Sequence, residues 1–332
     1  MKIAVIGAGS WGKNLVRNFY ELGVLKTVCD LNVDNTARAK EKYPDISVTN
    51  SMQSVIDDTD VDGVVVATPA HTHYEIAKAS LLAGHNVYVE KPLAQNVDEA
   101  KELHKIAEEK NLILMVGHLL LYHPAVNKLK EIISSGELGT VQYINSDRRN
   151  FNANHRSHSN VMWDLAPHDF SMMAYILNAE PEKIVNVKTW ASSGDSIDVA
   201  HIDMVFPNNI GGHIHNSWLD PQKQALLTVN GSNKTAVLND TFKENKLEIY
   251  SRREDGGITV EKPVYSNDEP LRLECRHFLD CIEKKQKPTS DSINGYQVVK
   301  YVETCQNFIS SNPKETELDV CTTIEKLQKS LV

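Results

Sequence analysis

The sequence has few cysteines, few aromatic residues and no long apolar run, and these scarcities exclude several classes of protein. Its five cysteines in 332 residues are an odd number and show no Cys-x-x-Cys spacing. This argues against a disulfide scaffold and favours a reduced, cytoplasmic chain. No apolar run approaches the roughly 20 residues of a membrane span, so we expect no membrane partner.

Basic residues are fewer than acidic ones. The chain has 35 Lys and Arg and 44 Asp and Glu, which gives a formal net charge of −9. An acidic surface without a basic block argues against nucleic acid as a partner. It does not exclude an anionic ligand, because backbone N–H groups at a helix N-terminus can bind phosphate. The length predicts about two domains at about 150 residues each.

The first 120 residues alternate between apolar, strand-like runs and helical patterns, which predicts a doubly wound parallel sheet. The N-terminus is an opening strand rather than a signal peptide. The expected strands cover residues 3–6, 24–29, 61–67, 87–90 and 112–116. The expected helices cover residues 11–22, 34–42, 73–83 and 97–110. Gly84 is placed to end the third helix as a C′ glycine.

The pattern changes after about residue 120, so we predict two domains, residues 1–120 and 121–332. Short alternating segments between turn signals predict an open, mainly antiparallel sheet in the second domain. Its expected strands cover residues 141–150, 184–191, 199–206, 210–218, 225–229 and 247–250. Its expected helices cover residues 124–134, 164–177, 271–284, 293–310 and 322–331, the last packing back on the first domain.

Residues 7–12 read GAGSWG and match G-x-G-x-x-G between a strand and a helix, which is the Rossmann fingerprint for a dinucleotide. Gly7 permits the tight turn, Gly9 lets the backbone approach a pyrophosphate, and Gly12 allows close packing. Ser10 and Trp11 of the same turn are candidate cofactor contacts. The alternative interpretation is a glycine-rich turn without a ligand.

Asp30 lies at the end of the second expected strand, 18 residues after Gly12. An acidic residue there accepts hydrogen bonds from ribose hydroxyls and repels a 2′-phosphate. No arginine follows directly, so NAD is favoured over NADP. The alternative is a loop aspartate that only solvates the strand end.

Thr68, Pro69, His71 and His73 follow the most apolar strand, at the sheet edge where ligands bind in such folds. We therefore count them as candidate cofactor contacts. The two histidines have no accompanying cysteine or carboxylate cluster, so we expect no metal. Capping of the next helix by Thr72 or His73 is the simpler interpretation.

Glu90, Lys91 and Pro92 end the next strand, and an Asp-x-x-x-His pattern follows at Asp164 and His168. Together with the glycine turn and the Thr-Pro step, these motifs resemble the glucose–fructose oxidoreductase/inositol dehydrogenase/MocA family over essentially the whole chain. The resemblance implies a Rossmann domain and a C-terminal α/β domain whose open sheet often joins subunits into dimers or tetramers. It also implies a cis bond before Pro92, with Glu90 and Lys91 as cofactor contacts, and NAD(P)-dependent oxidation or reduction of a sugar or cyclitol carbon.

Lys91, Asp164 and His168 are the candidate catalytic residues. An ammonium group at a strand end can stabilise developing alkoxide charge. Asp164 and His168 share one helical face, near a helix start where Asp164 also caps and Pro167 is tolerated. A histidine that titrates near neutrality suits acid–base chemistry. The resemblance implies that His168 takes the hydroxyl proton, Lys91 polarises the oxygen and Asp164 orients the site. The alternatives are a surface lysine and a capping Asp beside a structural His.

Further residues are candidates for substrate binding. For the arginines among them, the alternative interpretation is that they lie in an exposed basic loop. Three leucines at 119–121, where many relatives carry polar residues, argue against a polar contact from that loop. We still expect Tyr122 and His123 to line the cleft. The arginine-rich segment before the catalytic helix is suited to a diphosphate or carboxylate. The substrate-binding candidates are Lys91, His118, Tyr122, Arg149, Arg156, Trp163, Asp164 and His168, with Arg148, Asn152 and His155 in the same arginine-rich segment.

Other conspicuous residues are expected to be structural. His213 and His215 alternate along one strand and so face one side, as interface or surface histidines. Trp190 and Trp218 are expected to pack on a sheet face or at an interface. The cysteines have no flanking histidine or cation that would make them reactive.

Residues 161–169 look most like family members that act on nucleotide sugars. The resemblance therefore implies oxidation at C3 of a UDP-N-acetylglucosamine-type substrate. The rivals are an inositol or free-sugar dehydrogenase and, from another class, a non-catalytic dinucleotide-binding regulatory protein on the same fold.

Overall fold

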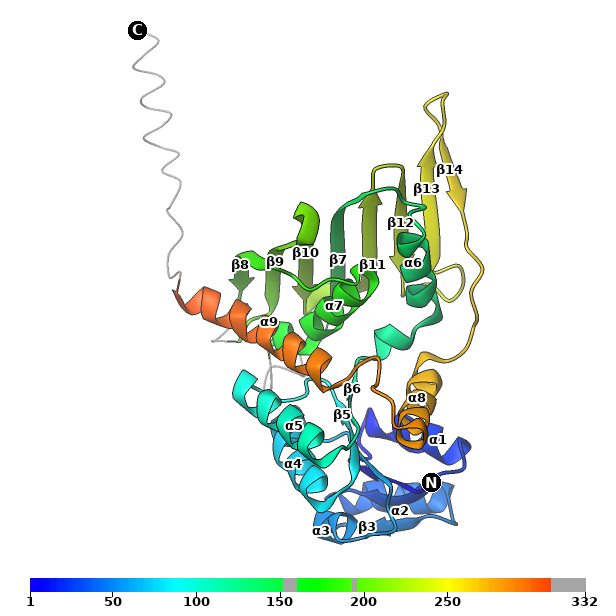
Figure 1. Ribbon diagram of the computed structural model, residues 1–332, viewed down its shortest axis with the longest axis vertical. Coiled ribbons are helices and arrows are strands. Elements are labelled where there is room, and N and C mark those ends of the chain that lie inside the picture. The colour runs from blue at the N-terminus through cyan, green and yellow to red at the C-terminus, as the bar shows by residue number, and fades with distance from the viewer. Residues whose placement is uncertain (152–159, 193–195, 312–332) are drawn as a thin grey trace.

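The computed structural model describes residues 1–151, 160–192 and 196–311, which form two sheets with their own helices (Figure 1). The first is a six-stranded parallel sheet of order β3-β2-β1-β4-β5-β6. Its strands are β1 (Ile3–Ile6), β2 (Leu25–Cys29), β3 (Ser47–Thr49), β4 (Gly63–Val66), β5 (Asn86–Glu90) and β6 (Leu114–Gly117). This order is the doubly wound Rossmann order, and it confirms the predicted fold of the first half.

Helices cover both faces of this sheet, so several of its strands, including the edge strand β6, are buried throughout. Every residue of β1, β4 and β6 is buried, which explains their uninterrupted apolar sequence. The helices are α1 (Gly12–Glu21), α2 (Val33–Lys42), α3 (Met52–Ile56), α4 (His73–Ala83) and α5 (Val97–Lys110). Gly84 ends α4 with a φ of +97°, as predicted.

The second sheet has eight strands in the order β14-β13-β12-β11-β7-β10-β9-β8. Its pairs are antiparallel except for β7 with β10, which confirms the predicted mainly antiparallel sheet. The strands are β7 (Val141–Phe151), β8 (Lys183–Trp190), β9 (Val199–Phe206), β10 (Ile210–Ser217), β11 (Leu219–Gly231), β12 (Lys234–Asn239), β13 (Leu247–Arg252) and β14 (Ile258–Glu261).

Helices α6 (Pro124–Ser134), α7 (Val161–Leu177) and α9 (Ser292–Ser311) pack against one face of this sheet. Buried and partly exposed residues alternate along β9, as expected for a sheet with one solvated face. That face carries Trp190, which is 51% exposed, and a row of histidines. His213 and His215 lie on one face, as predicted, and the ring of His201 stacks on that of His215 at 4.2 Å.

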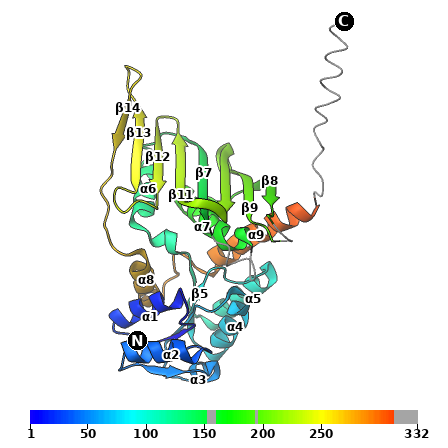
Figure 2. The ribbon, with the colours of Figure 1, turned by 180° about the vertical axis from the view of Figure 1, so that it is seen from behind.

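Two helices from the end of the chain connect the halves (Figure 2). Helix α8 (Pro270–Lys284) packs against α1 of the first half, whereas α9 packs against both α5 and α7. Among the described residues, no helix is long and apolar enough to cross a membrane. The predicted domain boundary near residue 120 stays a prediction, and the predicted helix at 322–331 lies outside the described residues.

The start of α7 differs from the prediction. The helix begins at Val161, and its N-cap is Asn160, whose side chain accepts a hydrogen bond from the Trp163 N–H at 3.1 Å. Asp164 is therefore inside the first turn rather than at the cap, and Pro167 lies inside the helix rather than in its first turn. The prediction failed because three consecutive apolar residues at 161–163 gave no clear helical period before Asp164.

Candidate active site

The glycine turn between β1 and α1 has no room for a side chain at two of its three glycines. A Cβ on Gly7, whose φ is +97°, would lie 2.5 Å from the carbonyl oxygen of Ala67. A Cβ on Gly12 would lie 2.0 Å from the carbonyl oxygen of Gly7. Gly9 differs, because a Cβ there would meet no described atom within 4 Å. The turn therefore combines tight packing with one open backbone position, which fits a dinucleotide pyrophosphate.

Asp30 is fixed at the end of β2, beside the glycine turn. Its Oδ2 accepts a hydrogen bond from the Ala8 N–H at 2.7 Å, and its Oδ1 accepts one from the Asn32 N–H at 2.8 Å. The residue is partly exposed, so its carboxylate can also accept hydrogen bonds from the hydroxyls of a ribose. This position fits the predicted NAD contact.

His73 connects the turn after β4 to the turn after β5. Its ring is buried between two backbone carbonyl oxygens, that of Pro92 at 2.8 Å from Nδ1 and that of Thr68 at 2.9 Å from Nε2. Burial lowers the pKa of His73. We infer that His73 fixes the two turns relative to each other, so that any effect on a cofactor is indirect.

The predicted capping of α4 by Thr72 or His73 is confirmed for the position of Thr72 but not for a side-chain hydrogen bond. Thr72 is the N-cap residue, but its hydroxyl donates to the Pro69 carbonyl at 2.7 Å instead of accepting from the helix. His71 is exposed in a single turn of 3-10 helix. Within the described parts of the chain, no group of three or more metal-binding side chains could hold a metal ion.

Glu90 joins the glycine turn to the strand end that carries Lys91. Its Oε1 accepts hydrogen bonds from the indole N–H of Trp11 at 2.6 Å and from the Tyr88 hydroxyl at 3.2 Å. Burial raises the pKa of Glu90, and the Trp11 hydrogen bond and the Lys91 charge oppose that rise. The peptide bond after Lys91 is cis, as the family resemblance implied.

Lys91 and Asp164 form an ion pair between the two halves. The Lys91 ammonium lies 3.0 Å from Asp164 Oδ1 and donates to the Asp164 backbone carbonyl at 2.7 Å. The other carboxylate oxygen accepts a hydrogen bond from the indole N–H of Trp218 at 3.2 Å. Trp218 is only 1% exposed and belongs to the apolar core of the second sheet, which agrees with the expected packing on a sheet face, and its bond to Asp164 was not expected.

Two imidazoles lie near the Lys91 ammonium. The Nδ1–H of His118 donates to the Asn294 side-chain oxygen at 2.6 Å, which makes its Nε2 an acceptor. That Nε2 and the Nδ1 of His168 are buried without a hydrogen-bond partner among the described residues. A hydroxylated ligand could supply the missing partners.

Burial lowers the pKa of His118 to about 4 and that of His168 well below its ordinary value, and the charge of Lys91 contributes to both shifts. We expected His168 to titrate near neutrality, and that expectation is wrong. Burial outweighs any carboxylate effect, and nearby Arg148 lowers the pKa of His168 further. Both rings are neutral at pH 7, which is the form that accepts a proton.

The two described arginines of the arginine-rich segment point to opposite faces of β7. Arg148 donates from Nε to Asp169 at 3.0 Å, on the face that α7 covers. Arg149 instead forms ion pairs with Asp147 at 2.7 Å and Asp220 at 2.8 Å. The structure thus brings Arg148, but not Arg149, near His168. Asn152, His155 and Arg156 lie outside the described residues.

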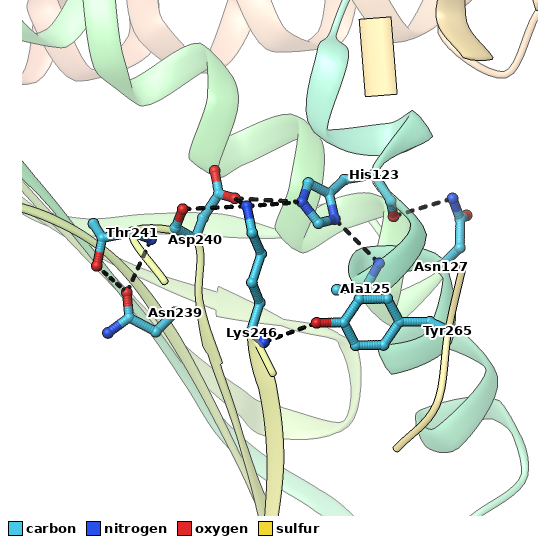
Figure 3. Close-up of polar contacts among 8 residues, drawn as sticks. All are labelled: His123, Ala125, Asn127, Asn239, Asp240, Thr241, Lys246 and Tyr265. Carbon is cyan, nitrogen blue, oxygen red and sulfur yellow. Dashed lines mark hydrogen bonds and ion pairs between the residues drawn. The ribbon is translucent and has the colours of Figure 1, made fainter. Parts of the chain in front are cut away.

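His123 lines a small cavity of about 10 Å³ between α6, α7 and the second sheet. Its Nε2 lies 3.3 Å from Asp240 Oδ1, which also pairs with Lys246 at 2.6 Å (Figure 3). Its Nδ1 accepts the Ala125 N–H at 3.1 Å and so caps α6. The cavity has room for about one water molecule, so it is no pocket for a sugar.

Two other predicted substrate contacts point elsewhere. The Tyr122 hydroxyl hydrogen-bonds the Ser290 hydroxyl at 2.8 Å, and its ring packs on His277 of α8. The Trp163 indole N–H donates to Gln306 of α9 at 2.8 Å. These contacts give no support to a substrate role for either aromatic residue.

Comparison with known proteins defines the class to which this protein belongs. Residues 1–118 match the model of an oxidoreductase family with an NAD-binding Rossmann fold, and residues 126–237 match the model of its C-terminal domain. The fold and the glycine turn therefore define an NAD-binding oxidoreductase. The chain belongs to the Gfo/Idh/MocA family, as its motifs indicated.

Individual relatives act on several carbohydrates. The chain is 24% identical to UDP-N-acetylglucosamine 3-dehydrogenase of Acidithiobacillus ferrooxidans, over 90% of this chain and 94% of that protein. It is also 24% identical to scyllo-inositol 2-dehydrogenase (NAD(+)) of Bacillus subtilis, over 89% and 90%. A levoglucosan dehydrogenase in complex with NADH and levoglucosan has the same fold, with a TM-score of 0.84, 21% identity and coverage of 94% and 97%.

Proposed function

We propose that the chain oxidises a secondary hydroxyl of a nucleotide sugar of the UDP-N-acetylglucosamine type, at C3. The observation that carries the proposed chemistry is the arrangement around Lys91, which pairs with Asp164 next to His118 and His168. A cation, a carboxylate and two neutral imidazoles suit the removal of a proton from a hydroxyl.

The glycine turn and Asp30 would hold NAD, which would supply the hydride acceptor for the carbon that carries this hydroxyl. Neutral His168 takes the hydroxyl proton, and the Lys91 ammonium stabilises the negative charge that develops on oxygen. Asp164 holds the ammonium in place with two of its atoms, the backbone carbonyl oxygen and the side-chain Oδ1. The Nε2 of His118 accepts a hydrogen bond from a second substrate hydroxyl.

The identity of the sugar rests on similarity. The relative named as UDP-N-acetylglucosamine 3-dehydrogenase spans nearly the whole chain, and residues 161–169 resemble members that act on nucleotide sugars. The proposed oxidation at C3 follows from that relative's name. We also propose a homodimer or homotetramer joined through the exposed sheet face, which light scattering would test. A cytoplasmic location stays a prediction.

A free cyclitol or sugar is the second candidate, and one observation favours it. Lys91, Arg148 and Lys246 each have a carboxylate partner within 3.0 Å, in Asp164, Asp169 and Asp240. In the described part of this region, the charges of these three cations are therefore already balanced by carboxylates. Little positive charge is left to bind a diphosphate. The scyllo-inositol dehydrogenase relative is consistent with such a neutral substrate.

A titration separates the two candidates. UDP, dTDP, myo-inositol and glucose are each titrated into the NAD-saturated protein by calorimetry, and turnover of UDP-N-acetylglucosamine is followed by NADH absorbance. Our proposal predicts that UDP binds even without its sugar. It also predicts that UDP-N-acetylglucosamine is oxidised. If neither nucleotide binds while free inositol or glucose is oxidised, the nucleotide-sugar assignment is wrong.

A further inference from the structure

Asn150 in β7 has a side-chain amide oxygen that the fold itself does not use. This oxygen is buried and has no hydrogen-bond partner among the described residues, although the residue as a whole is partly exposed. A buried carbonyl oxygen that loses its hydration without gaining a donor costs about 1–3 kcal/mol. Native proteins satisfy nearly all such atoms, so this one requires an explanation, and a bound ligand supplies one.

The alternation of β7 places Asn150 on the face of the second sheet that α7 covers. Ser146 and Arg148 precede it by four and two residues, and both bind Asp169 of α7. The Ser146 hydroxyl donates to Asp169 at 2.7 Å, and Arg148 Nε donates to it at 3.0 Å. Side chains two residues apart in a strand lie on the same face. Asn150 therefore shares its face with these two residues, and α7 is the helix that carries the predicted Asp-x-x-x-His pair.

The strand register places Asn150 close to this catalytic pair. Strands β7 and β10 are parallel, with Arg149 opposite Ser217. The next residues along the two strands are Asn150 and Trp218. The indole N–H of Trp218 donates to Asp164, the partner of the catalytic lysine, at 3.2 Å. The unused amide oxygen thus lies at the same level of the sheet as the indole that holds the catalytic carboxylate.

The surroundings of Asn150 identify the kind of group that fits. An amide oxygen only accepts hydrogen bonds, so its partner must carry an O–H or N–H. An ionised carboxylate has no such hydrogen and would leave the oxygen without a donor. The cation two residues before it, Arg148, is already balanced by Asp169 at 3.0 Å. The position therefore fits an uncharged hydroxyl rather than an anionic group.

We propose that Asn150 binds the substrate, and that its side-chain oxygen accepts a hydrogen bond from a further sugar hydroxyl, distinct from those that His168 and His118 contact. Asn150 thereby selects sugars that carry this hydroxyl in the matching position. The inference rests on the proposed oxidation of a hydroxylated substrate. It does not depend on whether a nucleotide is attached to the sugar.

Asn150→Leu tests the proposal, because leucine is similar in size and cannot form the hydrogen bond. For the sugar that the wild type oxidises, kcat/KM should fall about tenfold, while the Kd for NADH stays unchanged. Asn145→Leu, on the opposite face of the same strand, is the matched control and should change neither value. A wild-type kcat/KM in Asn150→Leu would overturn the proposal. If Asn150→Leu does not fold, Asn150→Ala is measured in its place and is judged by the same outcomes.

Monodeoxy analogues of the oxidised sugar separate a substrate contact from a purely structural role. Each analogue lacks one hydroxyl, and kcat/KM is measured for the wild type and for Asn150→Leu. For one analogue the two enzymes should have equal kcat/KM values, because the hydroxyl that Asn150 binds is missing. If the tenfold loss persists with every analogue, Asn150 does not bind a hydroxyl and the proposal is overturned.

The same measurements distinguish this inference from the proposed function. A wild type that oxidises none of UDP-N-acetylglucosamine, myo-inositol and glucose would contradict the proposed function, and this inference with it. A wild type that oxidises one of them while Asn150→Leu keeps the same kcat/KM would overturn this inference alone.

Discussion

The indole N–H of Trp218 lies 3.2 Å from Asp164 Oδ2, and the other oxygen of this carboxylate holds the Lys91 ammonium at 3.0 Å. Trp218 follows β10 and Lys91 follows β5, so the contact joins the two sheets through one side chain of α7. A buried indole that donates to a carboxylate restricts the carboxylate's rotation. The position of the Lys91 ammonium therefore depends on Trp218, although no described contact joins these two residues.

Trp218→Phe should lower kcat about tenfold while leaving the Kd for NADH unchanged. The substitution keeps an aromatic ring but removes a hydrogen bond to a charged group, and about 1.4 kcal/mol corresponds to a factor of ten. Steady-state kinetics and NADH titration measure the two effects. Trp190→Phe on the exposed sheet face is the matched control and should change neither. An unchanged kcat in Trp218→Phe would show that Asp164 needs no such support.

Acid should destabilise the protein through His118. Burial lowers the pKa of His118 from 6.5 to about 4, so the unfolded chain binds the proton more readily than the folded protein. The free energy of unfolding should therefore fall as the pH drops from about 6.5 toward 4. For this single group the loss is of the order of 3 kcal/mol.

Urea unfolding of the wild type and of His118→Gln between about pH 4 and pH 7 measures this loss of stability. The range covers roughly the pKa values of His118 in the folded and unfolded states. Glutamine cannot titrate, but it can still donate to Asn294. The variant should lose less stability on acidification than the wild type. Parallel pH curves would mean that His118 is not buried as a neutral ring.

Asp30→Asn should relax the discrimination against NADP. The amide can still accept the Ala8 N–H, which keeps the glycine turn in place, but it lacks the charge that repels a 2′-phosphate. We expect the ratio of kcat/KM for NAD over NADP to fall about tenfold. Asp34→Ala, an exposed acidic residue in the first turn of α2, is the control. An unchanged ratio in Asp30→Asn would remove Asp30 from the cofactor site.

Local sequence patterns were sufficient to predict most of the fold. The predicted bounds of α4, α5, α6 and β9 agree with the structure to the residue, because caps or turn residues flank each of them. β3 and β14, in contrast, are short strands at the sheet edges, and their few apolar residues show no periodicity. They were not predicted, because pairing with a neighbour rather than propensity determines them.

The candidate site was predictable only where motifs mark it. Lys91 and Asp164 were found from Glu-Lys-Pro and Asp-x-x-x-His, and the structure joins them at 3.0 Å. The role of Trp218 could not be found, because its partner Asp164 lies 54 positions away in the chain. Arg149 was a plausible anion contact by composition, but the alternation of β7 turns it toward Asp147 and Asp220.

The central claim is that Lys91 acts in the chemistry and not in holding NAD, and Lys91→Met tests it most directly. Hydride transfer is measured as single-turnover NADH formation, with the sugar that the titration and turnover assay above identify. NADH affinity is measured on the same preparation. The account predicts an NADH Kd within error of the wild type and a rate lowered about 10²- to 10³-fold, the loss typical of removing one charge-stabilising donor. A variant that binds NADH normally and still transfers hydride at the wild-type rate would contradict it.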